Sequence, residues 1–219
     1  VNSRRRIMLS YRPVISEAAA RAIRRESHDV AAAAKRIFKT RGVEDWDAWL
    51  DDYYPEYSQV MENGMRGTMQ SYAELIAAEA SDEVRWQGMA PNALEAFVGA
   101  YTAAMVSRHV FDSRTKLSAA VKLAQANGKA IEDAITDEVA KWEQDRADTL
   151  AKEESVRLNG ATSKAVYKDA GRTTLTWRAG GKSCPYCADL DGMVVGIEDN
   201  FLNEGDSLQP EGADGALDI

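Results

Sequence analysis

The sequence predicts a mainly α-helical protein, in which a long helical body is followed by a small C-terminal β-hairpin with a cysteine knuckle. Apolar residues recur at helical spacing through most of residues 14–160, whereas after residue 171 the pattern alternates and is β-branched. Both cysteines stand in one unit, Cys184-Pro-Tyr-Cys187. We therefore expect a helical body over residues 1–170 and a β-rich knuckle domain over 171–219. More than half of the residues should be helical, with strands confined to about 172–200.

The first half of the body is expected to contain two long helices. The first should run from Val14 to about Lys39, because it is rich in alanine and is followed by Gly42, a residue typical of helix ends. The second should begin near Glu44 and continue to Trp86, with Pro55 interrupting or kinking it. A break over residues 87–91 ends this half.

The later helices are predicted from their start and stop signals. Asn92 with Glu95 resembles a capping box, and Asn127-Gly128 and Asn159-Gly160 are sequences in which a helix commonly ends. We accordingly expect one helix from Asn92 and separate helices over residues 114–126, 129–158 and 163–169.

The hairpin is predicted from two β-branched segments and a turn. Residues 172–178 alternate around Trp177, and residues 193–197 form a second strand-like run. Asp191-Gly192 is a hairpin-type turn signal between them. After Asn200 the sequence is acidic and rich in glycine, and we expect a loop.

The overall composition is that of an ordinary globular chain. Its 219 residues are 45% hydrophobic and 28% charged. No apolar run approaches the roughly 20 residues that a membrane-spanning helix needs, so we expect no membrane partner. The chain lacks an initiator Met and a secretory signal, and we expect it to be a fragment of a longer protein.

Charge is distributed unevenly along the chain. Residues 1–41 carry 11 Lys/Arg against 3 acids, a net +8, whereas residues 195–219 carry seven acids and no base. The basic end is a candidate partner-binding segment, with Arg4, Arg5, Arg6, Arg21, Arg24 and Arg25 as its candidate residues. A solvated helix face is the alternative. Nucleic-acid binding as the main function is disfavoured because no aromatic residues are interleaved with these arginines.

Three interpretations compete for the cysteines: half of a zinc site, a redox dithiol, or a disulfide. A structural zinc needs four ligands, and the other soft candidates, His28 and His109, each lie in the middle of a predicted helix. A redox pair would open a helix after the first strand of a βαβ unit, which this segment does not do. We therefore expect no complete four-ligand zinc site within these 219 residues.

Residues 146–201 resemble the Mu F-like family of phage minor head (head-morphogenesis) proteins. The specific part of the resemblance is Cys184-Pro-Tyr-Cys187 followed by Leu190-Asp191-Gly192. Further residues match the family's order along the chain: Arg146, Leu150-Ala-Lys-Glu-Glu154, Asn159, Gly171, Leu175-Thr-Trp177 and Phe201. Family members usually continue to a His-Pro-x-Cys-x-Cys element, which this sequence does not reach. Residues 1–140 match only in being helical.

The resemblance implies a structural role in the phage virion. The protein would associate with the portal and other head proteins inside the procapsid, in the host cytoplasm during assembly, and leave the head interior with the DNA on ejection. Cys184 and Cys187 would be half of a metal site whose other ligands lie beyond Ile219. This chain as given would then have no cofactor, and a longer form would hold zinc. The alternative is a zinc-stapled helical adaptor of a bacterial cytosol, unrelated to virions.

Enzymatic activity is not expected. The sequence contains no Gly-rich phosphate loop, Gly-x-Ser-x-Gly elbow or His-Glu-x-x-His helix. For the basic segment we favour the portal as partner over packaged DNA. Exposed charge pairs contribute only about 0–1 kcal/mol each. Apolar residues of the same helix would therefore have to supply the remaining affinity, namely Ile15, Ile23, Val30 and Ile37.

Overall fold

A computed structural model describes residues 2–180 and 183–218, and in them the mainly α-helical fold is confirmed. Four long helices come first: α1 (Asn2–Ile37), α2 (Val43–Val84), α3 (Pro91–Asn127) and α4 (Ile131–Asp169). The C-terminal part contains β1 (Thr174–Thr176), α5 (Pro185–Asp189), β2 (Val194–Gly196), β3 (Ser207–Leu208) and β4 (Leu217–Asp218). None of the described helices is long and apolar enough to cross a membrane.

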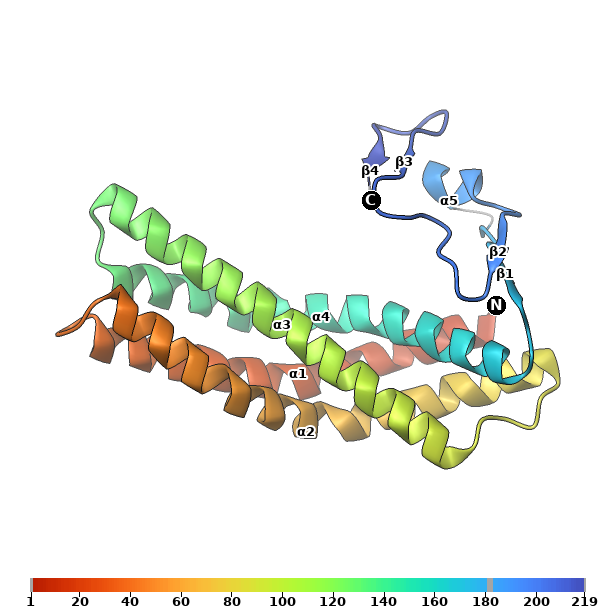
Figure 1. The fold of residues 1–219 in the computed structure, drawn as a ribbon, viewed down its shortest axis with the longest axis horizontal. Helices are drawn as coiled ribbons and strands as arrows, with labels where there is room; N and C mark the ends of the chain where they lie inside the picture. The colour runs from red at the N-terminus through yellow and green to blue at the C-terminus, as the bar shows by residue number, and fades with distance from the viewer. Residues whose placement is uncertain (1, 181–182, 219) are drawn as a thin grey trace. The chain divides into compact units, whose positions relative to one another are not determined.

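The chain forms two compact units, one ending at Ser163 and the other beginning at Lys164. This division falls within the C-terminal part of α4, whereas the predicted boundary between residues 170 and 171 follows the end of that helix at Asp169. In the first unit, the helices are joined by short turns, and α2 packs against both α1 and α3 (Figure 1). Its core includes Met61, Met65 and Met69, which follow one another at four-residue spacing on α2 and are fully buried.

Helices α1, α3 and α4 are longer than predicted, whereas α2 covers almost the predicted range. Helix α1 begins at Asn2 and contains Pro13, and α2 continues through Pro55. An internal proline costs about 3 kcal/mol or more, but buried side chains hold the helix on both sides of Pro55. Tyr54 and Tyr57 are each only 2% exposed. Tertiary packing therefore overrides the local signal.

The same reasoning corrects two predictions in the later helices. Residues 92–126 belong to one helix, α3, and α4 runs through Asn159-Gly160 because Leu158 and Thr162 are fully buried on either side. The predicted capping box is also wrong. Helix α3 has Ala90 as its N-cap and Pro91 as its first residue. Proline is favoured at the first helical position because the N–H that it lacks would have no partner within the helix. The predicted stop at Gly128 is confirmed by its left-handed φ of 64°.

The C-terminal unit contains the predicted hairpin and one strand pair that was not predicted. Strands β1 and β2 pair antiparallel with Leu175 opposite Val195, and Gly192 turns the chain with a φ of 84°. Strands β3 and β4 also pair antiparallel, so the expectation that strands are confined to residues 172–200 is wrong. Each of these strands has only two residues, which is too short to show a period-two pattern in the sequence.

Candidate functional site

The predicted cysteine knuckle is formed at the start of α5. Cys184 is the N-cap of this five-residue helix, Pro185 is its first residue, and Cys187 lies in its single turn. Both thiols are free. Hydrogen bonds from the backbone and side chain of Cys187 lower the pKa of Cys184, while the hydrogen bond with Cys184 raises that of Cys187. Two thiols therefore lie together, and one of them is favoured as a thiolate ligand or nucleophile.

A further metal ligand near the knuckle is not found in the part of the chain that the structure describes. No group of three or more His, Cys, Asp or Glu residues there is arranged to hold a metal ion. His28 lies exposed on α1, and His109 is buried on α3. Cys184 and Cys187 are therefore two candidate ligands, and a complete metal site in a longer chain stays a prediction.

The residues around the knuckle connect the two strands of the hairpin. The Trp177 N–H donates to the carbonyl of Met193 at 2.9 Å, and the Gly192 N–H donates to the carbonyl of Trp177 at 3.0 Å. Asp191 accepts a hydrogen bond from the Ala179 N–H at 2.9 Å. The Trp177 ring packs edge-on against Phe201 with 5.2 Å between centroids. The residues that carried the family resemblance thus maintain the turn.

The six predicted partner-binding arginines do not form one surface. Arg4 forms an ion pair with Glu83 and donates to Ser163, so it joins helices within the first unit. The remaining arginines are exposed on α1, at its start (Arg5 and Arg6) and further along (Arg21, Arg24 and Arg25). The second group lies on a face of α1 that also exposes Lys35 and Arg36.

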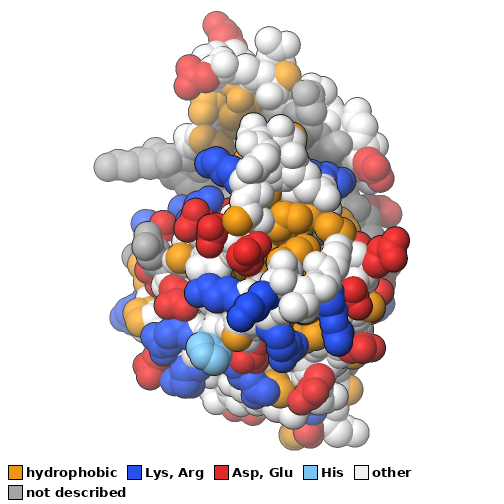
Figure 2. Space-filling model, turned by 90° about the vertical axis from the view of Figure 1, so that its left-hand side faces the viewer, with side chains coloured by type: hydrophobic (Ala, Val, Ile, Leu, Met, Phe, Trp, Pro, Cys, Tyr) orange, Lys and Arg blue, Asp and Glu red, His pale blue; other side chains and the backbone are white. Residues whose placement is uncertain are grey.

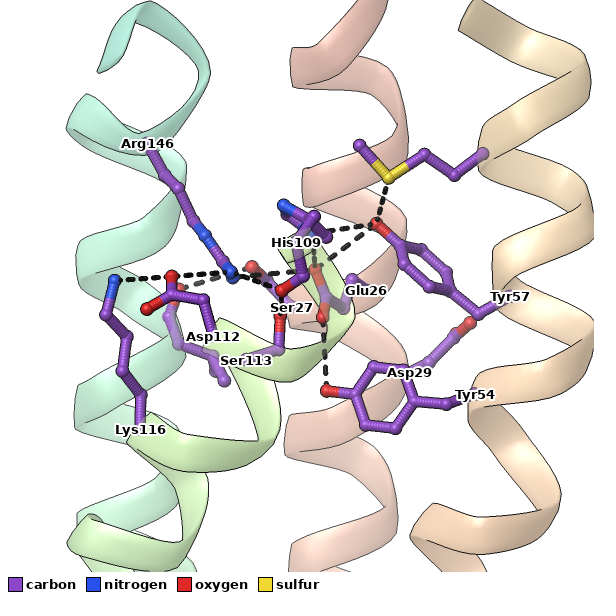
Figure 3. A network of polar contacts seen from close by, with 12 residues as sticks. Glu26, Ser27, Asp29, Tyr54, Tyr57, His109, Asp112, Ser113, Lys116 and Arg146 are labelled. Atoms are coloured by element: carbon purple, nitrogen blue, oxygen red, sulfur yellow. Dashed lines mark hydrogen bonds and ion pairs between the residues drawn. The ribbon is translucent and has the colours of Figure 1, made fainter. Parts of the chain in front are cut away.

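A buried polar network, which the sequence did not predict, joins all four long helices (Figure 3). Its centre is Glu26 of α1, which is fully buried. The hydroxyl groups of Tyr54 and Tyr57 from α2 donate to its two oxygens at 3.1 and 3.2 Å. His109 Nε2 of α3 lies 2.8 Å from Oε2, and Arg146 Nη1 of α4 lies 3.7 Å from the same atom.

Arg146 extends the network from α4 towards the surface. Its Nη2 donates to the carbonyl of His109 and to the carboxylate of Asp112, both at 3.0 Å. Its guanidinium also lies over the ring of Trp142, 4.5 Å from the centroid. Nη1 is buried without a hydrogen bond, so only the longer ion pair with Glu26 compensates it. Arg146 is thus held by two carboxylates, one fully buried and one half-exposed.

Burial and neighbouring charges act in opposite directions on the pKa of Glu26. Burial alone would raise it, but the hydrogen bond with His109 and the positive charges facing the carboxylate lower it below its ordinary value. The tyrosines respond oppositely, because burial and the Glu26 charge both raise the pKa values of Tyr54 and Tyr57. The network therefore favours a charged carboxylate and neutral phenols.

A second polar cluster surrounds Glu154, another residue of the family resemblance. Glu154 is 3% exposed and accepts hydrogen bonds from Tyr101 at 2.6 Å, Arg108 at 3.1 Å and Arg157 at 2.8 Å. It therefore connects α3 to α4, as Arg146 does. A cavity of about 350 Å³ lies between these helices and is lined by residues of both clusters, among them Arg108, Asp112, Arg146 and Glu154.

The Glu26 network sets the register of the four helices. Each helix contributes a polar side chain, so sliding one helix by a turn would leave buried groups without partners. A sequence signal for it existed: Glu26 is three residues after Ile23 and four before Val30, on the buried face of α1. His109 likewise follows Met105 and Val106 on the buried face of α3.

Comparison of the chain with protein-family models, curated proteins and solved structures found no match.

Proposed function

We propose that the protein is a phage minor head protein, a structural component that associates with the portal inside the procapsid and leaves the head with the DNA. The observation that carries the proposal is the string Cys184-Pro-Tyr-Cys187 with Leu190-Asp191-Gly192, located in a strand–knuckle–strand. The family resemblance supplies the portal as partner and the head interior as location.

The positions of the resembling residues support this proposal. Arg146 and Glu154 are each the α4 member of a polar cluster that ties this helix to its neighbours. The Trp177 ring packs edge-on against Phe201, and Leu190 is buried. These residues therefore have structural tasks, as expected of a protein whose role is assembly.

The form of the first unit also favours a structural role. Its most elaborate polar cluster has Glu26 fully buried at its centre, and a carboxylate sealed from solvent cannot meet a substrate in this conformation. Long amphipathic helices are suited to contacts with other helices. We accordingly propose no catalytic residue for this chain.

The test is co-sedimentation of the full chain with purified portal rings of the phage that encodes it. We expect the chain to sediment with the ring at physiological salt. A variant with Arg5, Arg6, Arg21, Arg24 and Arg25 changed to Glu measures the contribution of the basic segment. Arg4 is left unchanged because its contacts with Glu83 and Ser163 belong to the fold. A chain that never sediments with the ring would contradict the proposal and favour the cytosolic adaptor.

A further inference from the structure

The structure defines a basic face on α1 that the sequence did not delimit. It consists of five exposed cationic residues, Arg21, Arg24, Arg25, Lys35 and Arg36. At 3.6 residues per turn they lie within an arc of about 120° and extend for about 22 Å along the helix. On the face that Figure 2 draws, Lys and Arg side chains gather around the pale-blue His side chain, with Asp and Glu side chains among them.

The five cations of this basic face differ in whether they form ion pairs. Arg21 pairs with Glu17 at 3.1 Å, and Arg25 pairs with Asp29 at 3.6 Å. Arg24, Lys35 and Arg36, in contrast, form no ion pair with any residue that the structure describes. Unpaired cations on one face, in a chain of net charge −8, indicate a partner rich in negative charge.

The apolar residues that would have fixed a protein partner to this helix are not available. Ile15 and Val30 are fully buried, Ile23 is 1% exposed and Ile37 is 5% exposed, all within the helical unit. The face therefore offers charge with almost no apolar area. For a protein partner, each exposed ion pair contributes only about 0–1 kcal/mol. For a nucleic acid, by contrast, each neutralised phosphate releases condensed counterions, and charge alone supplies the affinity.

Aromatic residues of α2 border the basic face, although none is interleaved with the arginines in the sequence. Trp49 and Tyr53 line a groove of about 320 Å³ together with Arg25 and Arg36, and the carboxylates of Asp29 and Glu56 line it as well. The Trp49 ring is stacked on Trp46 at 5.3 Å and on Tyr53 at 4.7 Å. Since both of its faces are occupied, it cannot serve as the stacking platform that single-stranded nucleic acids use. The stacked Trp49 ring thus disfavours the binding of unpaired bases.

We propose that the basic face of α1 binds the phosphate backbone of double-stranded DNA without sequence preference. The inference rests on the proposed function only for the identity of the polymer, which is the packaged DNA. It departs from the expectation that the basic segment binds the portal.

The experiment measures binding of the full chain to a fluorescent 30-base-pair duplex by anisotropy between 50 and 200 mM NaCl. With four or five phosphates neutralised, the slope of log K against log salt should be about −4, so affinity should fall roughly 250-fold over this range. The triple variant Arg24→Gln/Lys35→Gln/Arg36→Gln should reduce the slope to between about −1 and −2. It should also weaken binding at least tenfold at 100 mM NaCl.

A matched control removes the same charge elsewhere. Lys122, Lys129 and Lys152 are exposed on or beside α3 and α4, and changing all three to Gln should leave DNA affinity within about twofold. Circular dichroism of each variant verifies that the helices remain folded. An equal loss of DNA affinity in both triple variants would show that the effect comes from net charge alone, and it would overturn the proposal.

Two further outcomes separate this inference from the proposed function. If the wild type binds no duplex at 50 mM NaCl, but the triple variant loses portal co-sedimentation, the face is a protein-binding surface and the inference is wrong. If duplex binding follows the predicted slope while the chain never sediments with the portal, the inference stands and the proposed function fails.

Discussion

Replacing Glu26 by Gln tests whether the buried network stabilises the fold. The change keeps the size of the side chain but removes the negative charge that faces Arg146 at 3.7 Å and His109 at 2.8 Å. Breaking a buried ion pair costs about 3–5 kcal/mol, because the remaining charge is left uncompensated. Arg146 retains Asp112 and the carbonyl of His109, so we expect the lower end of this range, about 3 kcal/mol.

The assay is urea unfolding followed by circular dichroism, together with a thermal melt. A loss of about 3 kcal/mol corresponds to a melting temperature lower by roughly 6–12 °C for a domain of this size. Glu17→Gln is the matched control, because Glu17 lies on the same helix with its side chain 77% exposed. Its effect should stay below about 0.5 kcal/mol.

The pH dependence of the same pair gives a second readout. Because the pKa of Glu26 is lowered in the folded state, its contribution is present above the unfolded value of about 4.3 and is lost as pH falls through the folded value. The difference between wild type and Glu26→Gln should therefore be full at pH 7 and shrink below about pH 4. A cost under 1 kcal/mol at pH 7, or a difference equal to that of Glu17→Gln, would refute the reasoning.

Three other predictions follow from the fold and the knuckle. Burial raises the pKa values of Tyr54 and Tyr57, and that of Tyr72 to about 12. Stability should therefore be full below pH ~10 and decline as pH rises above it; a phenolate absorbance at pH 10 that is larger in the folded wild type than in the Tyr54→Phe/Tyr57→Phe/Tyr72→Phe variant would contradict this. Gly128→Ala should destabilise by about 1 kcal/mol because φ is 64° there, whereas Gly160→Ala, inside α4 with open space around it, should stabilise by a similar amount; equal effects in urea unfolding would exclude the backbone explanation. Titration of this chain with cobalt should give no spectrum typical of a tetrahedral site with four protein ligands. With one equivalent of cobalt, the Cys184→Ser/Cys187→Ser variant should give the same spectrum as the wild type. A thiolate-to-cobalt band of four-ligand intensity in the wild type would disprove the prediction.

The sequence by itself determined the features that depend on neighbouring residues. Helical periodicity predicted the helical body, and the left-handed stop at Gly128 and the hairpin around Gly192 were expected from local turn chemistry. The Cys184-Pro-Tyr-Cys187 unit was also evident, because both of its cysteines lie within four consecutive residues. Each of these signals is satisfied by the backbone over one or two turns, so no distant contact is needed to interpret it.

The tertiary structure alone decided where helices continue and which side chains meet. Pro55 and Gly160 lie inside helices because buried side chains on both sides outweigh local costs of about 1–3 kcal/mol. Glu26 meets Tyr57, His109 and Arg146 only when the faces of four helices are brought together. His109 lies 83 residues from Glu26 along the chain, and Arg146 lies farther still. Periodicity indicates which face of a helix is buried but not which helix lies against it. The partner of a buried charge is therefore set by packing, since the free energy of the pair depends on distances that no local pattern encodes.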